Sequence, residues 1–116
     1  MPLGKRGQYG APTKSAWSFE IYDSDLERRM MERLEADPTV RKWTKRHGIT
    51  IRWLDDRHRR HSYRPDFLVE YVDGRLEIIE VKGAGLVDSS AVQRKRASAE
   101  LWCRRRGMEY SIATIE

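Results

Sequence analysis

The sequence contains one cysteine, Cys103, in 116 residues, and it has no apolar run near the ~18 residues of a membrane span. A single cysteine excludes a disulfide within the chain and any metal site built from several cysteines. The first residues also lack the apolar segment of a secretory signal. We therefore expect a soluble protein of a reducing compartment, neither secreted nor associated with a membrane.

Acidic residues are outnumbered, with 18 Asp and Glu against 23 Lys and Arg, and the net charge is +5. A chain of 13.7 kDa with 39% hydrophobic residues corresponds to one domain with one core. The basic balance favours a polyanionic partner, and nucleic acid is the commonest partner of this kind.

Residues 1–16 contain no acid, and glycines and prolines interrupt any regular pattern there. We expect a flexible basic N-terminal arm over 1–16, although a disordered end without a role explains the same pattern. The remainder, residues 17–116, is expected to form a single domain.

The domain is expected to be α/β, with the element order α-β-β-β-α-β. Ser24 and Glu27 have capping-box spacing, which predicts a helix that stops near the proline at 38. One helical turn is expected around residues 40–43. Strands are expected at 49–54, 62–71, 75–82 and 109–115, with a second helix over about 89–106. A right-handed crossover makes the last strand pair parallel, giving a small mixed sheet of about four strands flanked by helices.

The third expected strand ends with a carboxylate and an amine on one face, because Glu80 and Lys82 are two residues apart. Asp66 follows Pro65 on the neighbouring strand. Partly desolvated charges are costly unless they are paired or bound to metal. Two converging carboxylates suit Mg²⁺ or Mn²⁺, and an adjacent lysine can position an attacking water, which is the chemistry of phosphodiester hydrolysis.

Strand parity provides a test of this site. A two-residue turn at Asp73-Gly74 would place Asp66 and Glu80 on opposite faces of the sheet. The active-site hypothesis therefore predicts a loop with an odd number of residues, such as 73–75, or a β-bulge.

Pro65-Asp66, thirteen intervening residues and Glu80-Val81-Lys82 resemble the signature of PD-(D/E)XK nucleases. From residue 24 onward the chain most resembles the TnsA-like transposon endonuclease domain, through the segments 24–27, 37–40, 63–69, 73–74 and 79–83. Residues 95–107 are also similar to the endonuclease domain of type III restriction subunits, and the N-terminal part to phage head-completion proteins with a nuclease fold.

The resemblance implies a restriction-endonuclease-like fold and a Mg²⁺- or Mn²⁺-dependent deoxyribonuclease. It implies that Asp66, Glu80 and the backbone carbonyl of Val81 bind metal, that Lys82 is the catalytic lysine and that Glu27 is a catalytic carboxylate on the helix. The alternative role of Glu27 is that of a capping partner of its helix only. Related domains usually carry Gln-Pro where this chain reads Lys-Arg-His-Gly at 45–48.

Basic residues surround the proposed acidic cluster, with nine Lys and Arg against two Asp in residues 41–64. Such a rim can hold phosphates beside the carboxylates. The candidate DNA contacts are Arg52, Arg60, Arg64, Arg94 and Lys95.

Three histidines, His47, His58 and His61, raise the possibility of zinc. Loop residues or DNA contacts are the favoured interpretation, because no cysteine accompanies them.

Other functions remain open. The chain can be a nuclease-fold assembly or adaptor protein that binds DNA, in phage head completion or a transposition complex, or a Holliday-junction resolvase. The expected partners are DNA and either a second copy or a larger protein complex. The expected location is the cytoplasm of a bacterial host, with a phage or mobile element as the source.

Overall fold

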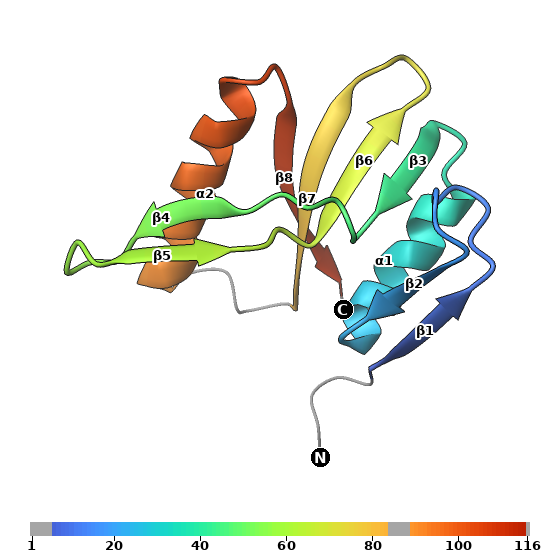
Figure 1. Ribbon diagram of the computed structural model, residues 1–116, viewed down its shortest axis with the longest axis horizontal. Helices are drawn as coiled ribbons and strands as arrows, with labels where there is room; N and C mark the ends of the chain where they lie inside the picture. The colour runs from blue at the N-terminus through green and yellow to red at the C-terminus, as the bar shows by residue number, and fades with distance from the viewer. Residues whose placement is uncertain (1–5, 84–88, 116) are drawn as a thin grey trace.

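The computed structural model describes residues 6–83 and 89–115. Its centre is a four-stranded sheet in the order β3-β6-β7-β8, in which only the β7–β8 pair is parallel (Figure 1). The strands are β3 (Val40–Thr44), β6 (Phe67–Tyr71), β7 (Leu76–Gly83) and β8 (Glu109–Ile115). The mixed α/β class is confirmed, and the architecture is consistent with a small restriction-endonuclease-like fold. The loop expected after β7 falls mostly at 84–88, outside the described residues.

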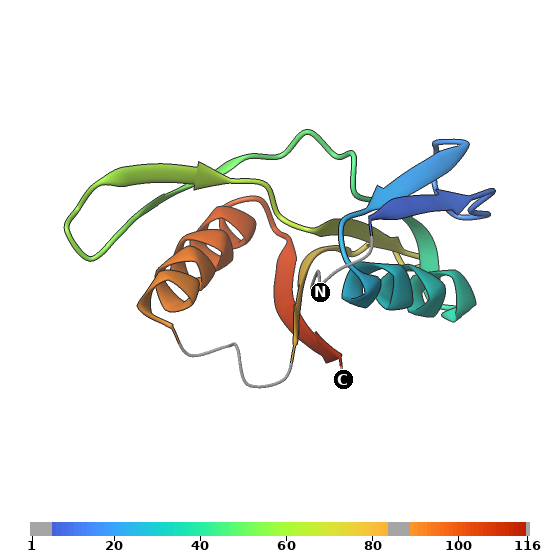
Figure 2. The same ribbon diagram turned by 90° about the horizontal axis from the view of Figure 1, so that it is seen from below.

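Two helices lie on opposite sides of this sheet, α1 (Asp25–Ala36) and α2 (Ser90–Arg104) (Figures 1 and 2). α2 connects β7 to β8 as the expected crossover. Side chains alternate along β7, so Ile79 joins the core under α1 while Glu80 points to the face that α2 covers. Neither helix is long and apolar enough to cross a lipid bilayer.

The start and end of α1 are confirmed. The Ser24 hydroxyl caps the helix by accepting the Glu27 N–H at 3.2 Å, and the helix ends one residue before Asp37-Pro38. Glu27 Oε1 accepts the N–H of Asp23 at 2.8 Å, one residue before the usual capping-box donor.

The segment expected to be an irregular arm contains a strand. β1 (Gly7–Gly10) pairs antiparallel with β2 (Phe19–Tyr22) and covers the α1 side of the molecule. A Cβ at Gly7 would lie 2.5 Å from the Tyr22 hydroxyl, so glycine here permits close approach to a neighbouring side chain. Beyond the strand, the Thr13 N–H donates to Glu35 at 2.7 Å. The expectation of an irregular segment is wrong for residues 7–10, and the flexible arm over 1–16 otherwise stays a prediction.

The helical turn expected at 40–43 is also wrong, because these residues form the edge strand β3. The register between β3 and β6 shifts between Val40 and Lys42, which marks a β-bulge. The bulge lets both Val40 and Trp43 face the core although they are three residues apart. A three-residue apolar spacing therefore imitates a helix in the sequence.

The long second strand expected at 62–71 is two strands. β5 (Arg60–Tyr63) pairs with β4 (Ile51–Leu54), and in the described residues these two strands form a separate ribbon rather than part of the main sheet. Residues 64–66 then interrupt the strand before β6 begins, since Pro65 cannot donate a ladder hydrogen bond. The ribbon extends across α2 (Figures 1 and 2).

The parity prediction is confirmed. The Tyr71 N–H donates to the Arg75 carbonyl at 2.9 Å, which leaves a three-residue loop at 72–74, one residue earlier than the example 73–75. The Phe67–Ile79 pairing then continues to place Asp66 opposite Glu80.

Candidate active site

A pocket of about 220 Å³ lies where β6 begins and β7 ends, on the α2 side of the sheet. Asp66, Glu80 and Lys82 all line this pocket, so three of the predicted site residues share one space. Arg64 and Lys95, two of the predicted DNA contacts, also line it. The pocket therefore contains two carboxylates and three cationic side chains.

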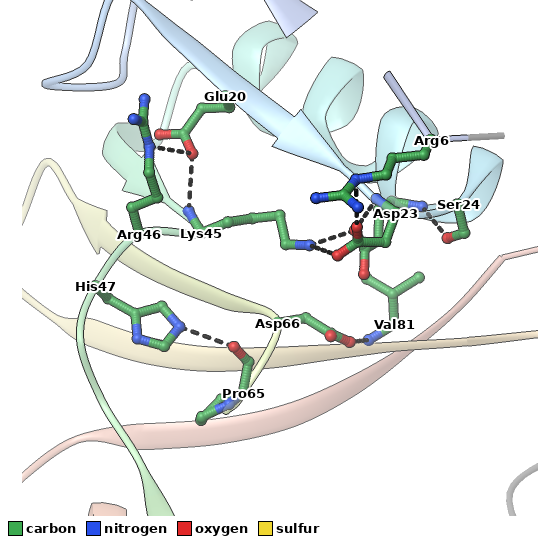
Figure 3. Close-up of polar contacts among 11 residues, drawn as sticks. Arg6, Glu20, Asp23, Ser24, Lys45, Arg46, His47, Pro65, Asp66 and Val81 are labelled. Carbon is green, nitrogen blue, oxygen red and sulfur yellow. Dashed lines mark hydrogen bonds and ion pairs between the residues drawn. The ribbon is translucent and has the colours of Figure 1, made fainter. Parts of the chain in front are cut away.

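The break before β6 explains how Asp66 reaches Val81. Hydrogen-bonded pairs recur every second residue from Tyr71–Arg75, so the position opposite Val81 belongs to Pro65. The Pro65 carbonyl instead accepts from His47 at 2.8 Å. Asp66 Oδ2 takes its place and accepts the Val81 N–H at 2.8 Å (Figure 3).

The direction of the Val81 carbonyl follows from the same strand geometry. The N–H and C=O of one strand residue point to the same side, so the Val81 carbonyl also faces the side where β6 has ended. The backbone opposite it is Pro65, which has no N–H to donate. This carbonyl is thus free of a β6 ladder donor, beside the Asp66 carboxylate.

Glu80 is the most deeply buried of the site carboxylates, with 5% of its surface exposed. Its Oε1 atom is buried and makes no hydrogen bond of good geometry among the described residues. The Tyr63 hydroxyl, which is buried in the same pocket, also makes none but is near enough to lower the pKa of Glu80. Burial, and then the negative charge of Asp66, raise the pKa of Glu80 above its ordinary value. Burial likewise raises the pKa of Asp66. A cation held by these oxygens would offset both effects.

These donors fit a hard divalent cation. Two carboxylates and one backbone carbonyl supply the oxygen ligands that Mg²⁺ and Mn²⁺ prefer, and waters can complete the octahedron. The unpartnered Glu80 oxygen is the observation that favours a cation here, since buried polar atoms are rarely left unsatisfied.

Two lysines flank the acidic pair from different elements. Lys82 follows Glu80 by two residues on β7, and its charge lowers the pKa of both carboxyl groups against the effect of burial. The Lys95 ammonium group comes from α2 and lies 5.3 Å from the centre of the Trp53 ring and 5.5 Å from that of Tyr63.

Glu27 does not line the pocket. Its carboxylate forms an ion pair with Lys45, and both side chains are 13% exposed. Lys45 Nζ also lies 3.4 Å from Asp23 Oδ2. Figure 3 shows these two side chains pointing toward one another. No three Asp, Glu, His or Cys side chains of the described residues gather closely enough to hold a metal, so Glu27 stands apart from Asp66 and Glu80. It is still near enough for its charge to raise the pKa of Asp66.

The contacts of Lys45 and its neighbours beside the site have no signal in the sequence. Glu20 is fully buried and accepts from the Thr44 hydroxyl at 2.8 Å and the Lys45 N–H at 3.2 Å. His47 Nε2 donates to Pro65, while its Nδ1 accepts the Ile49 N–H at 3.0 Å, which defines a neutral ring. Burial lowers the pKa of His47, in agreement with this state.

The remaining histidines lie on the ribbon. His61 contacts Asp55 at 2.9 Å and stacks on Trp53 with 4.6 Å between the ring centres. His58 occupies the tip of the turn with φ of 61°. Neither belongs to a metal-binding cluster within the residues that the structure covers.

The fold is that of a small mixed α/β domain, consistent with a restriction-endonuclease-like fold. The chain matches the family described as TnsA-like endonuclease N terminal over residues 37–115, which is most of its length. The protein therefore belongs to this family, as the sequence resemblance predicted. The matched region includes Asp66, Glu80 and Lys82 and begins after Glu27. A search of curated proteins found no match.

Proposed function

We propose that this protein is a DNA endonuclease that hydrolyses phosphodiester bonds with Mg²⁺ or Mn²⁺. The observation that carries the proposal is the pocket in which Asp66, Glu80 and Lys82 meet, with one buried Glu80 oxygen left without a partner. Membership of an endonuclease family supports the same chemistry.

Each side chain has a role that its position allows. Asp66, Glu80 and the Val81 carbonyl would hold the metal, which when bound polarises the phosphate and activates a water for attack. Lys82 would orient the attacking water and stabilise negative charge on the phosphate. Arg64 and Lys95 line the same pocket and would hold the phosphate of the DNA in line for attack.

The proposed role of Glu27 is to support this site from α1. Its ion pair with Lys45 places a carboxylate and an ammonium group beside Asp66, and both charges act on the pKa of Asp66. A direct catalytic role for Glu27 stays a prediction.

The proposal is tested by offering the purified protein linear, nicked, supercoiled and four-way-junction DNA with Mg²⁺, with Mn²⁺ and with EDTA. We expect cleavage only with metal, and we expect Asp66→Ala and Lys82→Ala to abolish it. Glu70→Gln is the matched control, because Glu70 shares the sheet face of Asp66 but lies outside the pocket.

Other outcomes separate the alternatives. Cleavage by both site variants at the wild-type rate would refute the assigned residues. Binding without any cleavage would favour an adaptor or assembly protein, and cleavage confined to junctions would favour a resolvase. A homodimer or larger complex stays a prediction, to be checked by light scattering with and without DNA.

A further inference from the structure

The ribbon of β4 and β5 and the helix α2 enclose a second hollow, outside the acidic pocket. Its volume is about 490 Å³, and its charged lining consists of Arg52, Arg60 and Arg94. Trp53, Leu54, Ala97 and Ser98 complete the lining, so the hollow contains no acidic side chain.

A neighbouring hollow of about 330 Å³ continues along α2. It shares Arg52 and Ser98 with the first and adds Arg105 and Arg106, again without an acid. We call the two together the ribbon–helix groove. Figures 1 and 2 show the ribbon lying across α2. The shared lining residues Arg52 and Ser98 make the two hollows adjacent, so the arginines line an extended surface.

The side chains of the three arginines in the first hollow lack carboxylate partners in the part of the chain that the structure describes. Within residues 6–83 and 89–115, Arg52, Arg60 and Arg94 form no ion pair, whereas nearby Arg96 bonds Glu100 and Arg59 bonds Asp55, both at 2.9 Å. Like charges gathered in a groove raise the local positive potential, and they stabilise a bound anion rather than the fold.

We propose that the ribbon–helix groove binds the sugar-phosphate backbone of the DNA substrate, at contacts separate from the cleavage pocket; this inference rests on the proposed function. A row of guanidinium groups matches phosphates that repeat along a strand, and each can bond a phosphate through two N–H groups. A single small anion would leave most of this row unoccupied.

The groove and the cleavage pocket share a wall. Lys95 lines the pocket and lies over the rings of Trp53, which lines the groove, and of Tyr63, which lines the pocket. A DNA strand bound in the groove would therefore pass near the Lys95 ammonium group that lines the pocket. The groove supplies affinity and direction, while the carboxylates supply the chemistry.

The test measures binding without cleavage, by fluorescence anisotropy of a labelled DNA duplex in EDTA at several salt concentrations. The groove variant is Arg52→Gln/Arg60→Gln/Arg94→Gln. The control is Arg33→Gln/Arg41→Gln/Lys42→Gln, which removes the same charge from exposed positions on α1 and β3. Circular dichroism establishes that both variants are folded, and Arg94→Gln alone tests the groove without altering the ribbon.

We expect the groove variant to bind DNA at least about tenfold more weakly. The slope of the logarithm of the binding constant against the logarithm of salt concentration should become about three units less steep, near one unit per lost phosphate contact. Arg94→Gln alone should reduce the slope by about one, and the control should leave it unchanged. The proposal that the groove binds DNA would be overturned by either of two results. One is an equal loss of DNA affinity in the groove variant and the control, and the other is an unchanged slope in the groove variant.

The two proposals fail differently. A protein that cuts DNA normally but binds equally well without the three arginines refutes only the groove. A protein that loses DNA binding with those arginines but never cuts with any metal refutes only the endonuclease.

Discussion

Cationic side chains are used differently on the two sides of the sheet. On the α1 side, Arg28 bonds Asp25 at 2.8 Å and Lys45 bonds Glu27, so cations and carboxylates join the helix to itself and to the end of β3. On the α2 side, the groove arginines face solvent without carboxylate partners in the described chain. The same residue type thus stabilises structure around Glu27, whereas beside α2 three arginines line a hollow without carboxylates.

This difference changes the meaning of the net charge of +5. The excess positive charge is effective mainly where carboxylates are missing, and that region borders the acidic pocket. Coulombic attraction of DNA would therefore be strongest beside the residues proposed to cut it.

The sharpest test of this division separates cleavage from binding. Asp66→Asn removes a charge from the pocket and should lower the cleavage rate by about 10²–10³-fold, the usual cost of losing one electrostatic element of an active site. DNA affinity in EDTA should be unchanged or higher, since the repulsive carboxylate is lost. Parallel gel cleavage and anisotropy assays measure both, and a matching loss of affinity would contradict the division.

The acidic pocket between the two regions should make the stability of the metal-free protein depend on pH. Burial and Asp66 raise the pKa of Glu80 to about 7 from its ordinary 4.5. Between these values the folded protein holds more protons than the unfolded chain, so the free energy of unfolding falls as pH rises. The expected fall is on the order of 3 kcal/mol, at ~1.4 kcal/mol per pKa unit.

Urea denaturation in EDTA at several pH values across this window measures the effect. Glu80→Gln should flatten the profile, and Mn²⁺ should restore stability to the wild-type protein at the alkaline end by binding only the folded state. An identical slope in Glu80→Gln would show that Glu80 does not cause the effect.

Much of this arrangement was predictable where short-range patterns determine it. Ser24 and Pro38 mark the ends of α1 locally, and the two-residue spacing of Glu80 and Lys82 puts both on one strand face whatever the rest of the fold does. The odd loop after β6 followed from requiring Asp66 to share that face.

Other features depend on contacts between distant residues. The β3 bulge gave Val40 and Trp43 a helical spacing, and residues 7–10 form a strand because they pair with β2. The ion-pair partner of Glu27 is Lys45, 18 residues later in the chain. No local sequence pattern therefore indicates that Glu27 lies outside the pocket. The hydrogen bond from His47 to the Pro65 carbonyl could not be predicted for the same reason, since these residues are also far apart in the sequence.

Removing a paired cation on the α1 side should destabilise the fold. Lys45→Met leaves Glu27 partly buried without its counter-ion, and we expect a loss of about 1–2 kcal/mol, less than the cost of breaking a fully buried pair. Adding Glu27→Gln to Lys45→Met should recover part of this loss, because the uncompensated charge is then gone. Urea denaturation at constant pH gives both values, and purely additive losses would show that the pair is not coupled.

The smallest effect is expected from removing the groove arginines. Arg52→Gln, Arg60→Gln and Arg94→Gln should each change the free energy of unfolding by less than about 0.5 kcal/mol, because none contacts a carboxylate in the described residues. At low salt the triple variant should even gain a little stability, since mutual repulsion along the groove is relieved. Urea denaturation at low and high salt tests this directly. A loss comparable to that of Lys45→Met would mean that these arginines, too, hold the fold together and are not reserved for DNA.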